Sequence, residues 1–182
     1  MLDWRWDFTL DILPRLLVAT GNTLLAAGLG YAIAVVLGLV LALAQRTPSR
    51  AFTMVVREMV EFIRSTPLVL QIFFVFYVAP QFGIRLSPWT AGMIAIGLHY
   101  AAYLSEVYRG GLDSVPKGQW EAATSLNLST ARTYFRVIIP QAMPPSLAGM
   151  GNYLVGILKD TPMLSVIGVA ELMHTANAIG SE

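Results

Sequence analysis

The chain contains no cysteine and little charge. Without cysteine it can form no disulfide framework, no thiolate nucleophile and no cysteine-type metal site. Charged residues make up 13% of the sequence, about half of the roughly 25% that is usual in a soluble domain. The net charge is +1 and there is no tract rich in lysine or arginine, which argues against nucleic acid as a partner. There is also no GxxxxGK(S/T) loop to hold the phosphates of ATP.

Hydrophobic residues are abundant instead, at 55% of the chain, and they predict an all-α integral membrane protein with a single domain over residues 1–182. Residues 16–45 carry no charge, and their length exceeds the roughly 20 residues that cross a bilayer. We therefore expect the first transmembrane helix there. The preceding residues, MLDWRWDFTLDILPRLL, have acids where a signal peptide is basic, so we expect the mature protein to keep them.

Four further segments follow the first helix. Residues 52–80 begin amphipathic and then lose all charge, which predicts one long second helix that Pro67 kinks or restarts. Residues 87–108 predict a third crossing. Residues 137–158 predict the fourth crossing. This segment contains three prolines and three glycines and is expected to be broken rather than straight. Residues 161–180 hold two apolar stretches too short to span, which predicts a re-entrant or gate segment.

A polar insert, residues 114–135, separates the third and fourth crossings. Pro116 suits the first turn of a helix, and we expect that helix over Lys117–Leu126. Asn127 follows, and asparagine is the usual substitute for glycine in the left-handed conformation that ends helices. Ser129 can cap a second helix. The sequence therefore predicts a helix, a tight turn and another helix, with Trp120 and small residues sharing one face.

The distribution of lysine and arginine predicts the orientation of the chain. Residues 46–57 carry three basic residues and residues 109–136 carry four, whereas residues 81–88 carry one. We therefore expect the insert to be cytoplasmic and the N-terminus to lie outside. By its residues alone, the insert is either a solvated loop on the bilayer or a docking element for a soluble partner.

The insert resembles the coupling motif of ABC importer permeases, in which E-A-A is followed by three residues, glycine, nine residues and I-x-L-P. Glu121, Ala122 and Ala123 match E-A-A, and VIIP at residues 137–140 matches I-x-L-P with two conservative exchanges, Val137 for isoleucine and Ile139 for leucine. The chain departs from the pattern at Asn127, where the family usually has glycine. Because asparagine tolerates the left-handed turn, we expect the loop to keep its fold.

The resemblance extends over nearly the whole chain. Segments such as EFIRSTPLVLQIFF, YLSEVYRGGLDSVPKGQWEAA and GNYLVGILKDTPMLSVIGVAEL resemble permeases of polar amino-acid ABC importers of the histidine, glutamine and arginine type. The segment GLHYAAYLSEVYRGGLDSVPKGQWEAATSLNLS is similar to the ectoine/hydroxyectoine subgroup. The resemblance implies the type I ABC importer permease fold. Permeases of this family usually have five crossings, so four here imply that one C-terminal helix is missing.

The resemblance also implies partners and roles. It implies a multi-pass permease of the bacterial inner membrane that pairs with a second copy or a paralogue. A solute-binding protein outside would deliver substrate, and a separate ABC ATPase would hold ATP, so no cofactor is expected on this chain. Contact with the ATPase would fall to six residues of the insert. They are Gln119, Trp120, Glu121, Ala122, Ala123 and Asn127.

Some polar residues inside the apolar segments are candidates for a translocation pathway. They are Gln71, His99, Tyr100, Asn152, Lys159 and Asp160. Each also has an ordinary role to weigh: hydrogen bonds between helices for the first four, and helix capping or a surface turn for Lys159 and Asp160. Two distant histidines make a metal site a poor hypothesis.

Two more features leave alternatives open. Glu106 and Arg109 are three residues apart, so they can form an ordinary interfacial ion pair or one that positions the insert. An ion-coupled secondary transporter or channel would also use broken helices, although the insert would then have no role. A purely structural membrane anchor is disfavoured by the prolines and glycines of residues 137–158.

Overall fold

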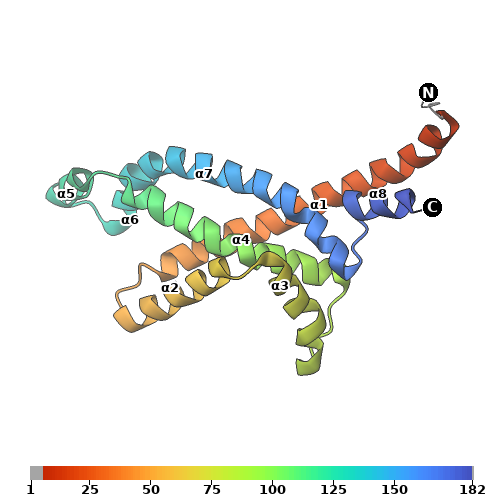
Figure 1. Ribbon diagram of the computed structural model, residues 1–182. Helices are drawn as coiled ribbons and strands as arrows, with labels where there is room; N and C mark the ends of the chain where they lie inside the picture. Colours follow the sequence, from red (N-terminus) through yellow and green to blue (C-terminus); the bar gives the residue numbers. More distant parts are fainter. Residues whose placement is uncertain (1–5, 182) are drawn as a thin grey trace. The chain divides into compact units, whose positions relative to one another are not determined.

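The computed structural model describes residues 6–181, and every regular element in that range is helical (Figure 1). Residues 1–5 of the expected N-terminal segment lie outside the described residues. The α-helices are α1 (Trp6–Ala44), α2 (Arg50–Ser65), α3 (Leu68–Phe73), α4 (Pro88–Asp113), α5 (Lys117–Ser125), α6 (Thr130–Thr133), α7 (Ile139–Asp160) and α8 (Leu172–Gly180). Two π-helical turns, η1 (Phe74–Val78) and η3 (Tyr134–Ile138), and two 3₁₀ turns, η2 (Ala79–Phe82) and η4 (Thr161–Ile167), complete the chain. The prediction of an all-α protein is confirmed.

The helices form two compact units. The first comprises the residues as far as Ile33, Thr66–Gly97 and the residues from Gly156 onward. The second comprises Ala34–Ser65 and Leu98–Val155, and therefore contains the insert. Helices α1, α4 and α7 each run from one unit into the other.

In the first unit, side chains of α1 hold the segment before α8. The amide of Asn22 donates to the carbonyl of Ala170 at 2.8 Å, and the backbone N–H of Leu172 donates to the hydroxyl of Thr23 at 3.0 Å. The carboxylate of Glu171 is fully buried and accepts hydrogen bonds from the first N–H groups of α8. These contacts satisfy backbone groups that a helix start would otherwise leave unpaired.

In the second unit, small residues let the helices approach closely. A Cβ atom on Gly111 of α4 would lie 2.0 Å from the hydroxyl oxygen of Ser146 on α7. A Cβ atom on Gly149 of α7 would lie 2.8 Å from a methyl group of Val107 on α4. Helices α4 and α7 therefore touch along much of their shared length, in the way that glycine permits in membrane proteins.

The structure differs from the expected second helix over residues 52–80. Helix α2 ends at Ser65, and α3 begins at Leu68 after Pro67 adopts φ −57° and ψ 136°. Proline disfavours the helical conformation for the residue before it, so Thr66 cannot continue α2 easily. Of the two outcomes expected at Pro67, the chain shows a restart.

The structure also differs from the broken helix expected over residues 137–158, because α7 continues through Pro144 and Pro145. The backbone changes before Pro140, at the start of the helix. In η3 the N–H of Ile139 donates to the carbonyl of Tyr134, five residues back, and this wider turn comes directly before Pro140. The same arrangement precedes Pro80, where the N–H of Ala79 donates to Phe74. A widened turn accommodates a proline ring that would otherwise clash with the preceding turn.

The apolar helices differ in how well they suit a bilayer. Helix α1 is long and apolar enough to cross by itself. The broken pairs Arg50–Ser65 with Leu68–Phe82, and Thr130–Ile167 with Leu172–Gly180, also qualify if each pair is one span, which gives up to three among the described residues. Helix α4 has 26 residues, or about 39 Å at 1.5 Å per residue, and is not among these candidate spans.

Candidate functional site

The insert folds as a helix, a turn and a second helix at one end of the second unit, shown by α5 and α6 in Figure 1. Helix α5 covers Lys117–Ser125, close to the predicted Lys117–Leu126. Pro116 lies one position earlier than predicted, at the N-cap, with φ −54° and ψ 138°. Its fixed φ suits that extended position as well as the first turn.

The turn after α5 depends on Asn127. Among the described residues, it is the one non-glycine residue with a positive φ (51°). The N–H of Leu128 donates to the carbonyl of Ala123 at 3.1 Å, and the N–H of Asn127 donates to Thr124 at 2.9 Å. These two bonds define a Schellman motif. The predicted left-handed conformation at Asn127 is confirmed, and so is the predicted cap at Ser129, whose hydroxyl accepts from the N–H of Arg132.

Substitutions at Asn127 test this turn. Asn127→Gly is expected to be neutral or to stabilise by a few tenths of a kcal/mol, because glycine adopts positive φ without strain. Asn127→Val is expected to destabilise the protein by about 1–3 kcal/mol, because a β-branched residue is strained there. Thermal unfolding of the purified proteins measures both. Equal melting temperatures for the two variants would contradict the assignment.

One face of α5 packs against the rest of the second unit. The Trp120 ring meets the Tyr134 ring edge-on with centroids 5.3 Å apart, and it covers the core of Val115, Ile138 and Ala142. Ala123 is only 2% exposed. The sequence grouped Trp120 and Ala123 among the residues expected to meet a partner. In the structure both side chains face inward, and this face of α5 holds the insert to its own chain.

The rest of the insert is exposed. Four of the six residues expected to meet a partner are exposed: Gln119, Glu121, Ala122 and Asn127. The Gln119 side chain also accepts a hydrogen bond from Gln141 at 3.2 Å. Sequence reasoning missed two exposed hydrophobic residues of the insert, Leu126 (73%) and Phe135 (72%). Their isolation between polar neighbours was the available signal. We call Glu121, Ala122, Leu126 and Phe135 the outward face of the insert.

An ion-pair network lies at the end of α4, directly before the insert. The predicted pair is confirmed: Arg109 donates two hydrogen bonds to the carboxylate of Glu106, one of them at 3.3 Å. Arg109 also lies 3.6 Å from Asp113, and Arg46, just beyond α1, pairs with the same Asp113. The amide of Gln45 donates to the hydroxyl of Ser105 at 3.4 Å nearby. Together these contacts join the end of α1 to the end of α4.

His99 and Tyr100, two of the pathway candidates, belong to an aromatic cluster in the second unit. His99 lies 5.1 Å from Tyr103 between ring centroids, and Tyr153 of α7 lies 5.4 Å from Tyr103 and 6.1 Å from Tyr100. The guanidinium of Arg64 lies 5.3 Å from the centre of the Tyr103 ring. Tyr103 and Tyr153 were missed, although Tyr103 follows His99 by four residues and so shares its face of the helix.

The remaining pathway candidates are divided between the units. Asn152 is exposed in the second unit. In the first, the amide of Gln71 donates to the carbonyl of Thr66 at 3.1 Å, Lys159 is exposed, and Asp160 precedes η4 without a side-chain cap bond to it. After Gln71, the aromatic rings of Phe73 and Tyr77 stack with their centroids 5.5 Å apart.

Comparison with known proteins identifies the family. Residues 34–180 match the family described as "Binding-protein-dependent transport system inner membrane component". The chain belongs to this family. It is 46% identical over 186 residues to a probable amino-acid ABC transporter permease, y4tG, of Sinorhizobium fredii, covering 98% of this chain and 80% of that one. It is 40% identical over 153 residues to the L-cystine permease TcyB of Bacillus subtilis, covering 84% and 65%.

Solved structures agree with the family. The chain matches one described as an amino acid ABC transporter with histidines, with a TM-score of 0.90, 33% identity and coverage of 99% of this chain and 84% of that one. The MetNI methionine transporter, at 15% identity and a TM-score of 0.69, shares the fold. The predicted type I permease fold is confirmed, and this amino-acid ABC permease is a transport component of the inner membrane.

Proposed function

We propose that this permease carries polar amino acids or related zwitterions inward, driven by a separate ABC ATPase that docks on the outward face of the insert. The observation that supports this docking site is the exposure of two apolar side chains of the insert, Leu126 and Phe135, together with that of Glu121 and Ala122. The buried centre of a protein–protein interface is typically apolar and enriched in aromatic side chains such as that of Phe135, and its rim is polar. ATP belongs to the ATPase in this proposal, and no cofactor to this chain.

The contacts of the insert suit the transmission of movement. Helix α5 is held to its own unit by Trp120 against Tyr134, by buried Ala123 and by the hydrogen bond between Gln119 and Gln141. A helix fixed in this way moves with the elements behind it when a partner pushes its other face. Rigid-body shifts of this type are a common route from ATP-driven closure to a change of opening.

The remaining partners are proposals from the family. An extracytoplasmic solute-binding protein would deliver substrate, and a second copy or a paralogous permease would complete the membrane domain. The lysine and arginine distribution supports a cytoplasmic insert and an external N-terminus. Relatives are described as permeases for cystine, nopaline and glutamine.

For the substrate, we propose a zwitterion whose carboxylate is bound by a cation and whose ammonium group is bound by aromatic rings. In support, the aromatic cluster of His99, Tyr100, Tyr103 and Tyr153 lies beside the guanidinium of Arg64. A guanidinium binds a carboxylate and aromatic faces attract an ammonium group. Gln71, Asn152, Lys159 and Asp160 remain candidates for the pathway. Ectoine and hydroxyectoine are the narrower proposal, to be compared with polar amino acids in the same assay.

The test is co-purification of the ATPase with permease variants, together with ATP-driven uptake in vesicles. Leu126→Asp is expected to weaken ATPase binding at least tenfold, the change that about 1.4 kcal/mol produces, because it places a charge in the apolar centre of the contact. Leu126→Met keeps the apolar surface and serves as the matched control. Normal binding and uptake by Leu126→Asp, or uptake that follows an ion gradient without ATP, would refute the proposal.

A further inference from the structure

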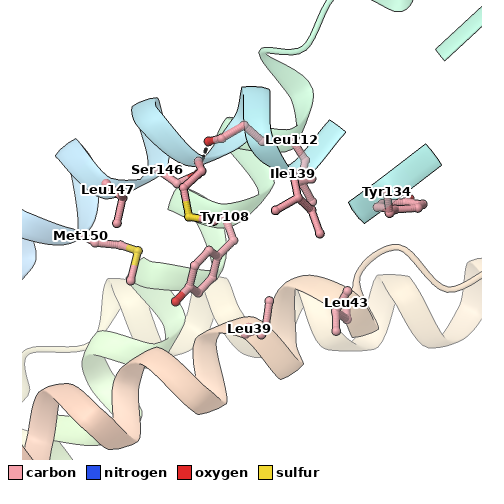
Figure 2. Close-up of a pocket in the computed structure, with 11 residues that line it drawn as sticks. Leu39, Leu43, Tyr108, Leu112, Tyr134, Ile139, Ser146, Leu147 and Met150 are labelled. Atoms are coloured by element: carbon pink, nitrogen blue, oxygen red, sulfur yellow. Dashed lines mark hydrogen bonds between the residues drawn. The ribbon is translucent and has the colours of Figure 1, made fainter. Parts of the chain in front are cut away.

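The second unit contains an apolar cavity of about 270 Å³ between α1, α4, η3 and α7 (Figure 2). Its lining residues come from these four elements. They are Leu39, Leu43, Tyr108, Leu112, Tyr134, Ile139, Ala142, Met143, Ser146, Leu147 and Met150. None of them belongs to the outward face of the insert or to the pathway candidates. The volume far exceeds the roughly 30 Å³ that one water occupies in the liquid.

The walls of the cavity are almost entirely apolar. The hydroxyl of Tyr108 donates to the carbonyl of Val35 at 3.3 Å. The hydroxyl of Ser146 donates to the carbonyl of Ala142 at 2.8 Å, the bond drawn in Figure 2. The other surfaces are aliphatic, thioether or aromatic. A ligand of this cavity is therefore apolar where it enters, because an entering polar group would lose its hydrogen bonds with water.

The cavity cannot close by drawing α7 closer to α4. These helices already touch at Gly111 with Ser146 and at Gly149 with Val107. The space lies where α4 and α7 together face the end of α1, beside Leu39 and Leu43. An apolar group that enters a cavity of this size gains dispersion contacts with its lining.

The mouth of the cavity is formed by exposed apolar residues: Leu39 (47%), Leu43 (56%), Met143 (47%) and Leu147 (55%). Leu39 and Leu43 lie in the last two turns of α1, which is long and apolar enough to span a bilayer. The medium beside the mouth is therefore the edge of the hydrocarbon region. Acyl chains are the apolar molecules present there.

Charge at the same end specifies the kind of lipid. Arg132 and Arg136 lie two residues on either side of Tyr134, a lining residue. Both are exposed and form no salt bridge within residues 6–181. A guanidinium is well matched to a phosphate group. We propose that the cavity binds one acyl chain of a membrane phospholipid and that Arg132 and Arg136 hold its phosphate.

Photolabelling tests the proposal on the permease assembled with its ATPase in nanodiscs. The probe is phosphatidylglycerol with a photoactivatable group in the middle of one acyl chain, and mass spectrometry maps the labelled residues. We expect label on the inner wall, at Leu112 and Met150, as well as on the exposed rim. Arg132→Gln with Arg136→Gln is expected to lower the inner label about tenfold.

Substitutions at the mouth provide the matched controls. Leu39→Trp and Met143→Trp fill the entrance and are expected to remove most of the inner label. Val36→Trp places the same ring on a 62% exposed position of α1 that does not line the cavity, and is expected to leave the label unchanged. Label confined to the rim, inner label insensitive to the tryptophans, or an inner wall that crosslinks only to a second permease copy would each overturn the proposal.

Discussion

Ala123→Asp is expected to destabilise the permease by several kcal/mol and to abolish ATP-driven uptake. Ala123 is 2% exposed, and its carbonyl accepts the hydrogen bond that closes the turn at Asn127. An unpaired carboxylate at this buried position would lose its hydration without a compensating cation. Thermal unfolding of the purified protein and uptake in vesicles measure the two losses.

The neighbouring residue provides the control. Ala122 is exposed on the outward face, so Ala122→Asp adds the same carboxylate where water can solvate it. We expect Ala122→Asp to keep the wild-type melting temperature within about 2 °C, since surface substitutions usually change stability by less than about 0.5 kcal/mol. Its expected defect is in ATPase binding alone. If Ala123→Asp also melted like the wild type, the inward orientation of Ala123 would be wrong.

This contrast shows what periodicity can and cannot predict. The spacing of Trp120, Ala123 and Asn127 correctly indicates that the first two share one face of a helix. It does not show whether that face meets a partner or the same chain. The answer depends on Tyr134 and Ile138, which reach Trp120 only after the turn at Asn127 brings η3 back toward α5.

The predictions that depended on residues close to one another in the sequence were the most reliable. The left-handed Asn127, the cap at Ser129 and the pair of Glu106 with Arg109 each depend on residues within a few positions of one another. Such interactions follow from backbone conformation and side-chain reach. The aromatic cluster differs, because Tyr153 meets Tyr100 and Tyr103 only once α7 packs on α4.

The prolines of residues 137–158 show that a local prediction can also be wrong. Proline in a helix interior usually kinks or breaks it, and three prolines in six residues justified that expectation. The structure has a π-helical turn, η3, that accommodates Pro140, and α7 then continues through Pro144 and Pro145. No residue type marks such a turn clearly, so the sequence did not reveal it.

Gly111→Ala is expected to destabilise the permease by about 1–3 kcal/mol, the usual cost of forcing an extra group into a packed site. The new methyl group would lie 2.0 Å from the Ser146 hydroxyl oxygen and 3.0 Å from the carbonyl oxygen of Ala142. Rotation of the Ser146 side chain relieves the first contact but breaks its hydrogen bond to Ala142, and the second contact is with backbone. Helix α7 must therefore move away from α4.

Gly110→Ala is the matched control, because this glycine is adjacent on α4 and a Cβ atom added to it would meet nothing within 4 Å. Alanine favours the helix over glycine by up to about 1 kcal/mol, so we expect a higher melting temperature. The two variants thus add the same methyl group to the same helix but are expected to change the melting temperature in opposite directions. Since α7 follows directly from the insert, displacement of α7 by Gly111→Ala should also lower uptake per ATP hydrolysed, whereas Gly110→Ala should not. Identical melting temperatures for the two variants would mean that α4 and α7 do not touch at Gly111.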